Sequence, residues 1–197
     1  MLELIIIILA FVLMYIFFLS EYKSDGIILE ESFIDGKKYW VRDLEDKASA
    51  ANTLANIKIN MEKLINYLKE NMDKYKDNEN YEYIKNLISR TKEIHIMETP
   101  SDEKYTSYTV NKGEKIYFCL RSKVLNEIHD MNTLLYVVIH EMSHIACPEY
   151  GHTPLFYDIF RFLLRVSINI GIYKDVDYRY KPQDYCGMTI NEYILTV

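Results

Sequence analysis

The sequence predicts an α+β fold, in which a small, mainly antiparallel sheet packs on helices and one transmembrane helix precedes the domain. Three observations support this prediction. An unbroken apolar run occupies residues 4–20. Apolar residues recur with helical spacing over residues 44–75, 133–147 and 155–170. Short alternating segments separated by turn residues lie at 93–121, and such segments are typical of strands.

The composition is that of a folded domain. The chain has 197 residues, of which 49% are hydrophobic and 14% aromatic, enough for one domain with a core plus an appendage. Its net charge of −6 argues against a surface built mainly to bind nucleic acid, so nucleic acid is not favoured as a partner. Cys119, Cys147 and Cys186 match no zinc-binding or C-x-x-C spacing, and we interpret them as reduced thiols of a reducing compartment.

The apolar run at 4–20 predicts a membrane anchor. As a helix it is about 25 Å long, at the short end of what crosses a bilayer. A cleaved signal peptide needs a basic start and a small-residue cleavage site, whereas Met-Leu-Glu precedes this run and Ser-Glu-Tyr ends it. We therefore expect an uncleaved anchor, residues 1–20, that contacts membrane lipid. Positive charges follow the run and hardly precede it, which places the rest of the chain in the cytoplasm; they are Lys23, Lys37, Lys38 and Arg42.

A linker at 21–26 leads into residues 27–96, the predicted hairpin and helical scaffold of the domain. Asp35-Gly36 between apolar segments predicts a β-hairpin. Residues 44–75 form an amphipathic helix, interrupted once, which we interpret as a scaffold helix packed on the core. A shorter helix follows at 81–90. Strands are expected at 93–98, 105–110 and 115–121, and the turn at 111–114 makes the last two pair antiparallel.

A candidate metal site lies in the second half of the domain, residues 97–197. His140-Glu141-Met142-Ser143-His144 falls within an apolar helix that Asn132 or Thr133 caps and that ends by Pro148. Side chains at i and i+4 share one helix face, so His140 and His144 can bind one metal ion. Glu141 lies about 100° round the helix, where it can reach a metal-bound water without being a ligand.

A third histidine, His152, follows a break in the chain. Thr153 and Pro154 begin the next apolar helix, at N-cap and first helical position, and Gly171 ends it. Three protein ligands with one open position form the catalytic arrangement of zinc. Asp158 is a possible partner that orients a ligating histidine, or an alternative third ligand. The chain after residue 173 is expected to wrap the core irregularly; it offers Cys186 as a possible inhibitory thiolate and three candidate oxyanion donors, Tyr178, Tyr180 and Tyr185.

The segment from His140 to Phe160 resembles the SprT-like and WLM-type zinc metallopeptidases. In that group a Gly-His-x-Pro-x-Phe-like segment, here residues 151–156, supplies the third zinc ligand at the start of the next helix. The resemblance extends more loosely over 105–185. Residues 41–44 and 185–188 look similar to a membrane-anchored variant from large DNA viruses of eukaryotes. Members that act on proteins crosslinked to DNA carry basic elements, whereas this chain is acidic.

The resemblance implies a zincin-like metallopeptidase domain. His140, His144 and His152 would bind zinc, and Glu141 would be the general base that activates a zinc-bound water and passes its proton to the leaving amine. In zinc peptidases of this design, the strand before the motif helix commonly lies beside the cleft, and its free edge can pair with an extended substrate. The sequence does not indicate which strand is the edge.

The predicted function is therefore a membrane-anchored, zinc-dependent metallopeptidase that hydrolyses a polypeptide substrate. It would lie in a single-pass membrane with its domain in the cytoplasm, or in the virion membrane if the protein is viral. Two alternatives remain. One is a membrane-bound structural or virion protein that keeps the zinc site for stability. The other is a non-catalytic adaptor that binds a partner through the amphipathic helix at 44–75. The sequence indicates no oligomeric state.

Overall fold

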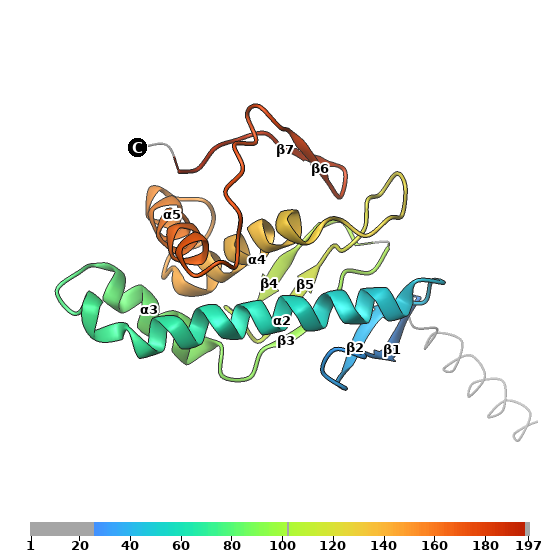
Figure 1. Cartoon of the computed structure of the whole chain (residues 1–197), viewed down its shortest axis with the longest axis horizontal. Coiled ribbons are helices and arrows are strands. Elements are labelled where there is room, and N and C mark those ends of the chain that lie inside the picture. Colours follow the sequence, from blue (N-terminus) through green and yellow to red (C-terminus); the bar gives the residue numbers. More distant parts are fainter. Residues whose placement is uncertain (1–25, 102, 196–197) are drawn as a thin grey trace, which may run out of the picture.

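The computed structural model describes residues 26–101 and 103–195, and Figure 1 shows how their helices and strands are arranged. The long helix α2 (Lys47–Glu70) runs along one side of the molecule. The hairpin of β1 (Ile27–Glu31) and β2 (Lys38–Arg42) lies at its start, and α3 (Asn80–Arg90) lies near its end. Helix α4 (Met131–Ala146) lies between α2 and a C-terminal hairpin. One buried apolar cluster draws residues from β2, α2, the central sheet, α4 and α5 (Pro154–Asn169), so these elements share a core.

The predicted N-terminal hairpin is confirmed. Strands β1 (Ile27–Glu31) and β2 (Lys38–Arg42) pair antiparallel. The Asp35 carboxylate accepts hydrogen bonds from the Lys37 backbone N–H at 3.1 Å and from the Tyr39 hydroxyl at 2.7 Å, which fixes the turn. Tyr39 and Val41 are buried on the inner face of β2. The hairpin is thereby attached to the domain along one face only.

The amphipathic segment at 44–75 forms α2 and, after Asn71, a short 3-10 helix (Met72–Tyr75), so the expected interruption falls there. Helix α3 (Asn80–Arg90) follows as predicted. The apolar face of α2 packs against β2, β3, α3 and α4, which agrees with its interpretation as a scaffold helix. It is buried through Ala50, Ala51, Leu54, Ala55, Ile57, Met61, Leu64 and Leu68.

The central sheet is mixed rather than mainly antiparallel, which corrects the predicted topology. Strands β4 (Tyr108–Val110) and β5 (Lys115–Phe118) pair antiparallel as expected, but β5 also pairs parallel with β3 (His95–Glu98), in the order β3-β5-β4. The reason is that β5 inserts between β3 and β4 instead of adding outside β4. Strand β4 is therefore an edge strand.

The two helices that carry the metal motif have local end signals. Thr153 accepts a hydrogen bond from the Phe156 backbone N–H at 3.3 Å and caps α5 (Pro154–Asn169), as predicted. Gly171 ends α5 with a φ of 68°, where glycine is favoured. Helix α4 ends before Pro148, also as predicted, but its N-cap is Asp130 rather than Asn132 or Thr133. The Thr133 backbone N–H donates to the Asp130 carboxylate at 3.0 Å.

The tail after residue 173 is more regular than predicted. Strands β6 (Gln183–Tyr185) and β7 (Met188–Ile190) pair antiparallel around a two-residue turn. Cys186 and Gly187 form this turn with φ values of 54° and 80°, as in the tight turns preferred by hairpins. Three-residue strands give too short an alternation to recognise in a sequence.

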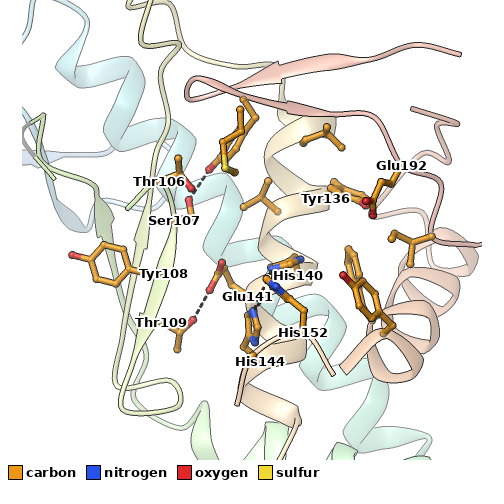
Figure 2. A pocket seen from close by; sticks show the side chains of 18 of the residues that line it. Thr106, Ser107, Tyr108, Thr109, Tyr136, His140, Glu141, His144, His152 and Glu192 are labelled. Carbon is orange, nitrogen blue, oxygen red and sulfur yellow. Dashed lines mark hydrogen bonds between the residues drawn. The ribbon is translucent and has the colours of Figure 1, made fainter. Parts of the chain in front are cut away.

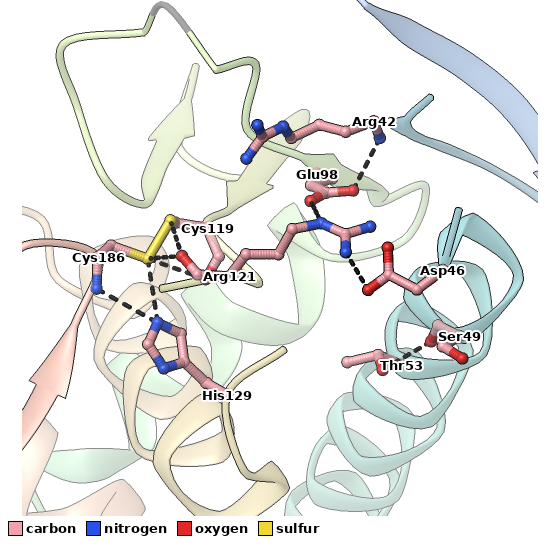
Figure 3. Close-up of polar contacts among 9 residues, drawn as sticks. All are labelled: Arg42, Asp46, Ser49, Thr53, Glu98, Cys119, Arg121, His129 and Cys186. Carbon is pink, nitrogen blue, oxygen red and sulfur yellow. Dashed lines mark hydrogen bonds and ion pairs between the residues drawn. A yellow bond between two sulfur atoms is a disulfide. The ribbon is translucent and has the colours of Figure 1, made fainter. Parts of the chain in front are cut away.

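The prediction of three reduced cysteines is wrong for two of them. Cys119, just after β5, forms a disulfide with Cys186 across 67 residues (Figure 3). Cys147 is free and buried. The pairing depends on the return of the tail to β5, which spacing along the chain does not reveal. His129 adds a polar contact here, since its Nε2 accepts a hydrogen bond from the Cys186 backbone N–H at 3.3 Å.

A buried ion-pair network joins the two halves of the domain (Figure 3). The Arg121 guanidinium donates to the Glu98 carboxylate at 2.7 Å through Nε and to Asp46, at the start of α2, through Nη1. Glu98 also accepts a hydrogen bond from the Arg42 backbone N–H at 2.8 Å. Since the Arg121 and Glu98 side chains are both buried, removal of Arg121 would leave the Glu98 charge without its cationic partner.

Within residues 26–101 and 103–195, no helix combines the length and apolar character needed to cross a membrane. The predicted anchor at 4–20 and all but the last residue of the predicted linker lie outside the described residues.

Candidate metal centre and cleft

Three histidine side chains converge beside α4 (Figure 2). His140 and His144 lie one turn apart on that helix, with their Nε2 atoms 3.2 Å apart. His152 precedes α5, and its Nε2 lies 3.0 Å from that of His140 and 3.2 Å from that of His144. We call these three residues the histidine cluster. Among the described residues, they are a group whose ligand atoms lie close enough together to hold one metal ion.

The geometry of the histidine cluster fits a tetrahedral zinc ion. Zn–N bonds of about 2.0–2.1 Å place two ligating nitrogens about 3.3 Å apart in a tetrahedron, close to the observed 3.0–3.2 Å. Burial and the neighbouring imidazoles lower the pKa of His140 to about 3 and that of His144 to about 4. Both rings are therefore neutral near pH 7, which is the form that binds a metal.

Aromatic packing holds these rings in place. The Phe156 ring stacks on His144 with a centroid distance of 4.2 Å and meets His140 edge-on at 4.9 Å. Phe160, one turn along α5, also meets His140 edge-on at 5.2 Å. Phe156 and Phe160 are buried, so α5 supplies a rigid apolar support behind the imidazoles.

Glu141 lies on the same helix but faces β4 (Figure 2). Its side chain is buried, with the residue only 5% exposed, and its Oε2 accepts a hydrogen bond from the Thr109 hydroxyl at 2.8 Å. Burial raises the pKa of Glu141 to about 7, and the Thr109 hydrogen bond opposes part of that rise. A carboxyl with this pKa can both accept and release a proton near neutral pH.

If the site hydrolyses peptides, Thr109→Val should lower kcat about tenfold while changing KM little, because a hydrogen bond to a charged group contributes about 1.5–3 kcal/mol and here orients the carboxylate. Steady-state kinetics on an unfolded protein substrate would measure both constants. The matched control is Thr53→Val, the same change on the distant helix α2. Equal kcat values for the two variants would remove Thr109 from any positioning role.

A cleft of about 700 Å³ surrounds the histidine cluster and Glu141. Helix α4 forms its floor, and the segment ending in β4 forms one wall. Tyr157 and Phe160 of α5 lie on the opposite side, and the C-terminal tail covers the top through Met188, Thr189, Ile190, Asn191, Glu192 and Ile194. We call this tail segment the roof of the cleft. The wall along β4 is lined by Thr106, Ser107, Tyr108 and Thr109.

The strand beside the cleft is the edge strand β4, not the strand that directly precedes α4 in sequence. One side of β4 pairs with β5, which leaves the backbone N–H and C=O groups of its other side available. β5, the strand nearer to α4 in sequence, lies in the middle of the sheet. The strand beside the cleft is therefore one strand earlier in the sequence than expected, because β5 inserts between β3 and β4.

The structure separates the other candidate site residues. The Asp158 carboxylate pairs with Arg161 at 2.5 Å and is not part of the histidine cluster. Cys186 forms the disulfide, so it offers no thiolate. Tyr185 is buried in the cleft wall with its hydroxyl 2.6 Å from Ser107 Oγ. The other two tyrosines are outside the cleft lining, because Tyr178 packs on the Tyr136 ring and Tyr180 is exposed.

Sequence reasoning missed several residues at the site. Thr109 contacts Glu141, which is 32 residues away in the sequence. The residues around Thr109 form no motif that would indicate this contact. Tyr136 and Tyr157 line the cleft, although helical spacing alone places Tyr136 one turn before His140. Lys112 donates from Nζ to the carbonyls of Cys147 at 2.9 Å and Glu149 at 2.7 Å, after the last turn of α4. It thereby fixes the segment that leads to His152.

The comparisons with known proteins give one relative that covers nearly the whole chain. Protein R325 of Acanthamoeba polyphaga mimivirus is 43% identical over 180 residues, which are 91% of this chain and 90% of that protein. The chain belongs to the R325 family.

Two further viral proteins are similar to this R325-family chain over about half of its length. Protein 136R of Invertebrate iridescent virus 6 is 35% identical over 98 residues, 48% of this chain and 49% of that protein.

Protein 042R of Invertebrate iridescent virus 3 is 40% identical over 88 residues, 44% of this chain and 52% of that protein. No protein-family model matches this R325-family chain. Among solved structures, two crystal structures of Wss1 from Saccharomyces cerevisiae are similar to part of it. Their TM-scores are 0.47 and 0.44 at 22% and 18% identity, and each match covers 66% of this chain and 88% of Wss1.

Proposed function

We propose that this R325-family protein is a zinc-dependent metallopeptidase. The observation that carries the proposal is the convergence of three Nε2 atoms within 3.2 Å of one another, next to a buried carboxylate on the floor of a cleft. A zinc site that only stabilises a fold is closed by four protein ligands. The histidine cluster offers three ligands and lines the cleft, so it fits a site in which one position would be open to water or substrate.

Each part of the site has a chemical role in peptide hydrolysis. His140, His144 and His152 would bind the ion through Nε2. When bound, zinc lowers the pKa of water to about 7 and polarises the scissile carbonyl. Glu141 would accept the proton of the attacking water and donate it to the leaving amine. Thr109 holds the carboxylate towards the substrate side of the cleft.

The substrate of this reaction is an extended polypeptide. The free edge of β4 can add a strand through main-chain hydrogen bonds, and such a strand would pass alongside Glu141. The cleft volume of about 700 Å³ suits several side chains. Tyr136, Tyr157 and Ile190 give the cleft an apolar component, so we expect preference for a polypeptide with at least one apolar side chain near the scissile bond.

We also propose that residues 4–20 anchor the protein in a membrane, with the domain on the cytoplasmic side or on the virion membrane. The length and apolar character of that run support the anchor. The lysines that follow it support the orientation. The cysteines no longer support a reducing compartment, because two of them form a disulfide. The net charge of −6 continues to disfavour nucleic acid as substrate or partner.

The ligand set is tested by metal analysis of variants. We expect His152→Ala to lose most of its zinc, because two imidazoles alone bind the ion weakly, whereas Asp158→Asn keeps wild-type zinc. Elemental analysis of each purified full-length variant after dialysis measures the content. If Asp158→Asn loses zinc and His152→Ala keeps it, the third ligand is the carboxylate and the proposed site is wrong.

The activity is tested by metal removal. Chelation should abolish cleavage of an unfolded protein by the full chain, and stoichiometric Zn²⁺ should restore it, because the proposed chemistry requires the ion. Gel analysis of casein digestion over time provides the readout. Zinc bound in full with no cleavage of any unfolded protein would favour the structural alternative.

A further inference from the structure

We propose that the β1–β2 hairpin is a second membrane contact of this protein, in which its apolar outer face enters the lipid interface and an adjoining basic groove binds anionic lipid headgroups. The inference concerns a surface remote from the histidine cluster. It goes beyond the proposed peptidase function and requires neither metal nor turnover.

The hairpin carries exposed apolar side chains on its outer face and at its tip. Leu29 and Trp40 lie directly opposite each other in the β1–β2 register and are 48% and 44% exposed. Phe33 and Ile34, at the tip, are 84% and 50% exposed. We call these four residues the hairpin patch. Alternation along β2 explains it, because Tyr39 turns inward to the core while its neighbour Trp40 turns outward. Several large apolar side chains exposed together mark an interaction site.

A basic groove lies beside this patch. It has a volume of about 320 Å³, and Trp40 is part of its lining. Lys38 of β2, Lys58 of α2 and Lys115 of β5 line it together with His95, and none of the described residues that line it is acidic. Carboxylates lie close by, because Glu31 is opposite Lys38 in the register and Asp35 interacts with Lys58. The basic character is therefore confined to the lining of the groove. Aromatic side chains next to lysines are the combination that binds the headgroup region of anionic membranes.

The position of the hairpin in the chain favours lipid as the occupant. The apolar run ends at residue 20 and the described structure begins at Gly26. Six residues span at most about 20 Å when fully extended. If the run is inserted, the hairpin is therefore held close to the bilayer surface. A second copy of this chain is a poorer occupant, because two lysine-lined grooves brought together would repel each other.

The proposed docking also leaves the cleft accessible. Figure 1 shows the β1–β2 hairpin at the start of α2 and the β6–β7 hairpin on the other side of α4. The roof of the cleft begins with β7 of that second hairpin. A membrane at the outer face of β1–β2 would thus lie away from the roof. Substrate could enter the cleft from the solvent side while the domain is held at a fixed orientation.

Trp40 provides a direct test, because it is the only tryptophan of the chain and the predicted anchor contains none. The full-length protein would be reconstituted into vesicles of phosphatidylcholine and phosphatidylserine with brominated acyl chains. We expect quenching of Trp40 emission by the brominated lipid and protection from aqueous acrylamide. Quenching by acrylamide alone would show that Trp40 stays in water. Protection from both quenchers would show that protein covers the patch. Either result overturns the proposal.

Variants separate the apolar and basic contributions. The double variant Phe33→Ser with Ile34→Ser should restore quenching of Trp40 by acrylamide. The control is Val124→Ser with Leu125→Ser in the loop before α4, where the two apolar side chains are also exposed, at 81% and 67%. This control should behave as wild type. Lys58→Gln with Lys115→Gln should lower the docking equilibrium roughly thirtyfold on vesicles with phosphatidylserine and leave it unchanged on phosphatidylcholine alone. Equal lipid quenching of the hairpin variant and its control would overturn the proposal. An unchanged circular dichroism spectrum would show that each variant is folded.

Discussion

Glu141→Gln is expected to abolish peptide hydrolysis while leaving zinc binding at the wild-type level. The carboxylate is not part of the histidine cluster, so its loss removes no ligand. The amide has nearly the same shape and can still accept the hydrogen bond from Thr109, so the local packing is preserved. It cannot accept a proton from water, and general acid–base catalysis contributes about 10²–10⁴-fold to such reactions. Zinc content and the rate of casein cleavage would be measured on the same preparation.

Glu149→Gln is the matched control for this variant. Glu149 is an exposed carboxylate in the segment between His144 and His152, so the change removes the same charge close to the site without removing the base. It should keep both zinc and activity. If Glu141→Gln cleaves casein at the wild-type rate, Glu141 is not the general base. If it loses zinc as well as activity, the carboxylate supports the metal site rather than the chemistry.

The parts of the site that could be predicted are those specified by local geometry. Helical periodicity alone places His140 and His144 on one face. The approach of His152 depends on signals a few residues apart: Pro148 forbids further helix, and Thr153 with Pro154 starts the next one. The rings then meet because α4 and α5 pack side by side. The signals that place each histidine thus lie within one or two helical turns of it in the sequence.

The parts that could not be predicted depend on competition between distant segments. The turn at 111–114 predicts that β4 pairs with β5, but not that β5 displaces β4 from β3. That insertion puts Thr109 on the strand next to Glu141. The disulfide likewise requires the C-terminal tail to return to β5 before the two thiols can meet. Such pairings are decided by the packing of the whole core, which no short sequence window contains.

Removal of the disulfide is expected to have the largest effect on stability. Cys119→Ser opens a cross-link that spans 67 residues, and chain-entropy arguments for a loop of this size give a loss of about 4 kcal/mol in the free energy of unfolding. The effect should reach the site as well, because Cys186 forms the turn of the β6–β7 hairpin and the roof of the cleft follows it directly. We therefore expect KM to rise in the folded variant, since the roof loses its covalent attachment to β5. Urea unfolding followed by circular dichroism would measure the stability.

A reductant distinguishes the cross-link from the local packing. Wild-type protein treated with dithiothreitol should unfold at the same urea concentration as Cys119→Ser, whereas the variant itself should be insensitive to reductant. Cys147→Ala is the control, because this buried cysteine is free and its replacement should leave the sensitivity to dithiothreitol intact. If reductant leaves wild-type stability unchanged, the cross-link does not contribute, and the roof must be held by noncovalent contacts such as the Tyr185–Ser107 hydrogen bond. If reduction lowers stability but not substrate affinity, the hairpin keeps its place without the disulfide, and its role is confined to the fold.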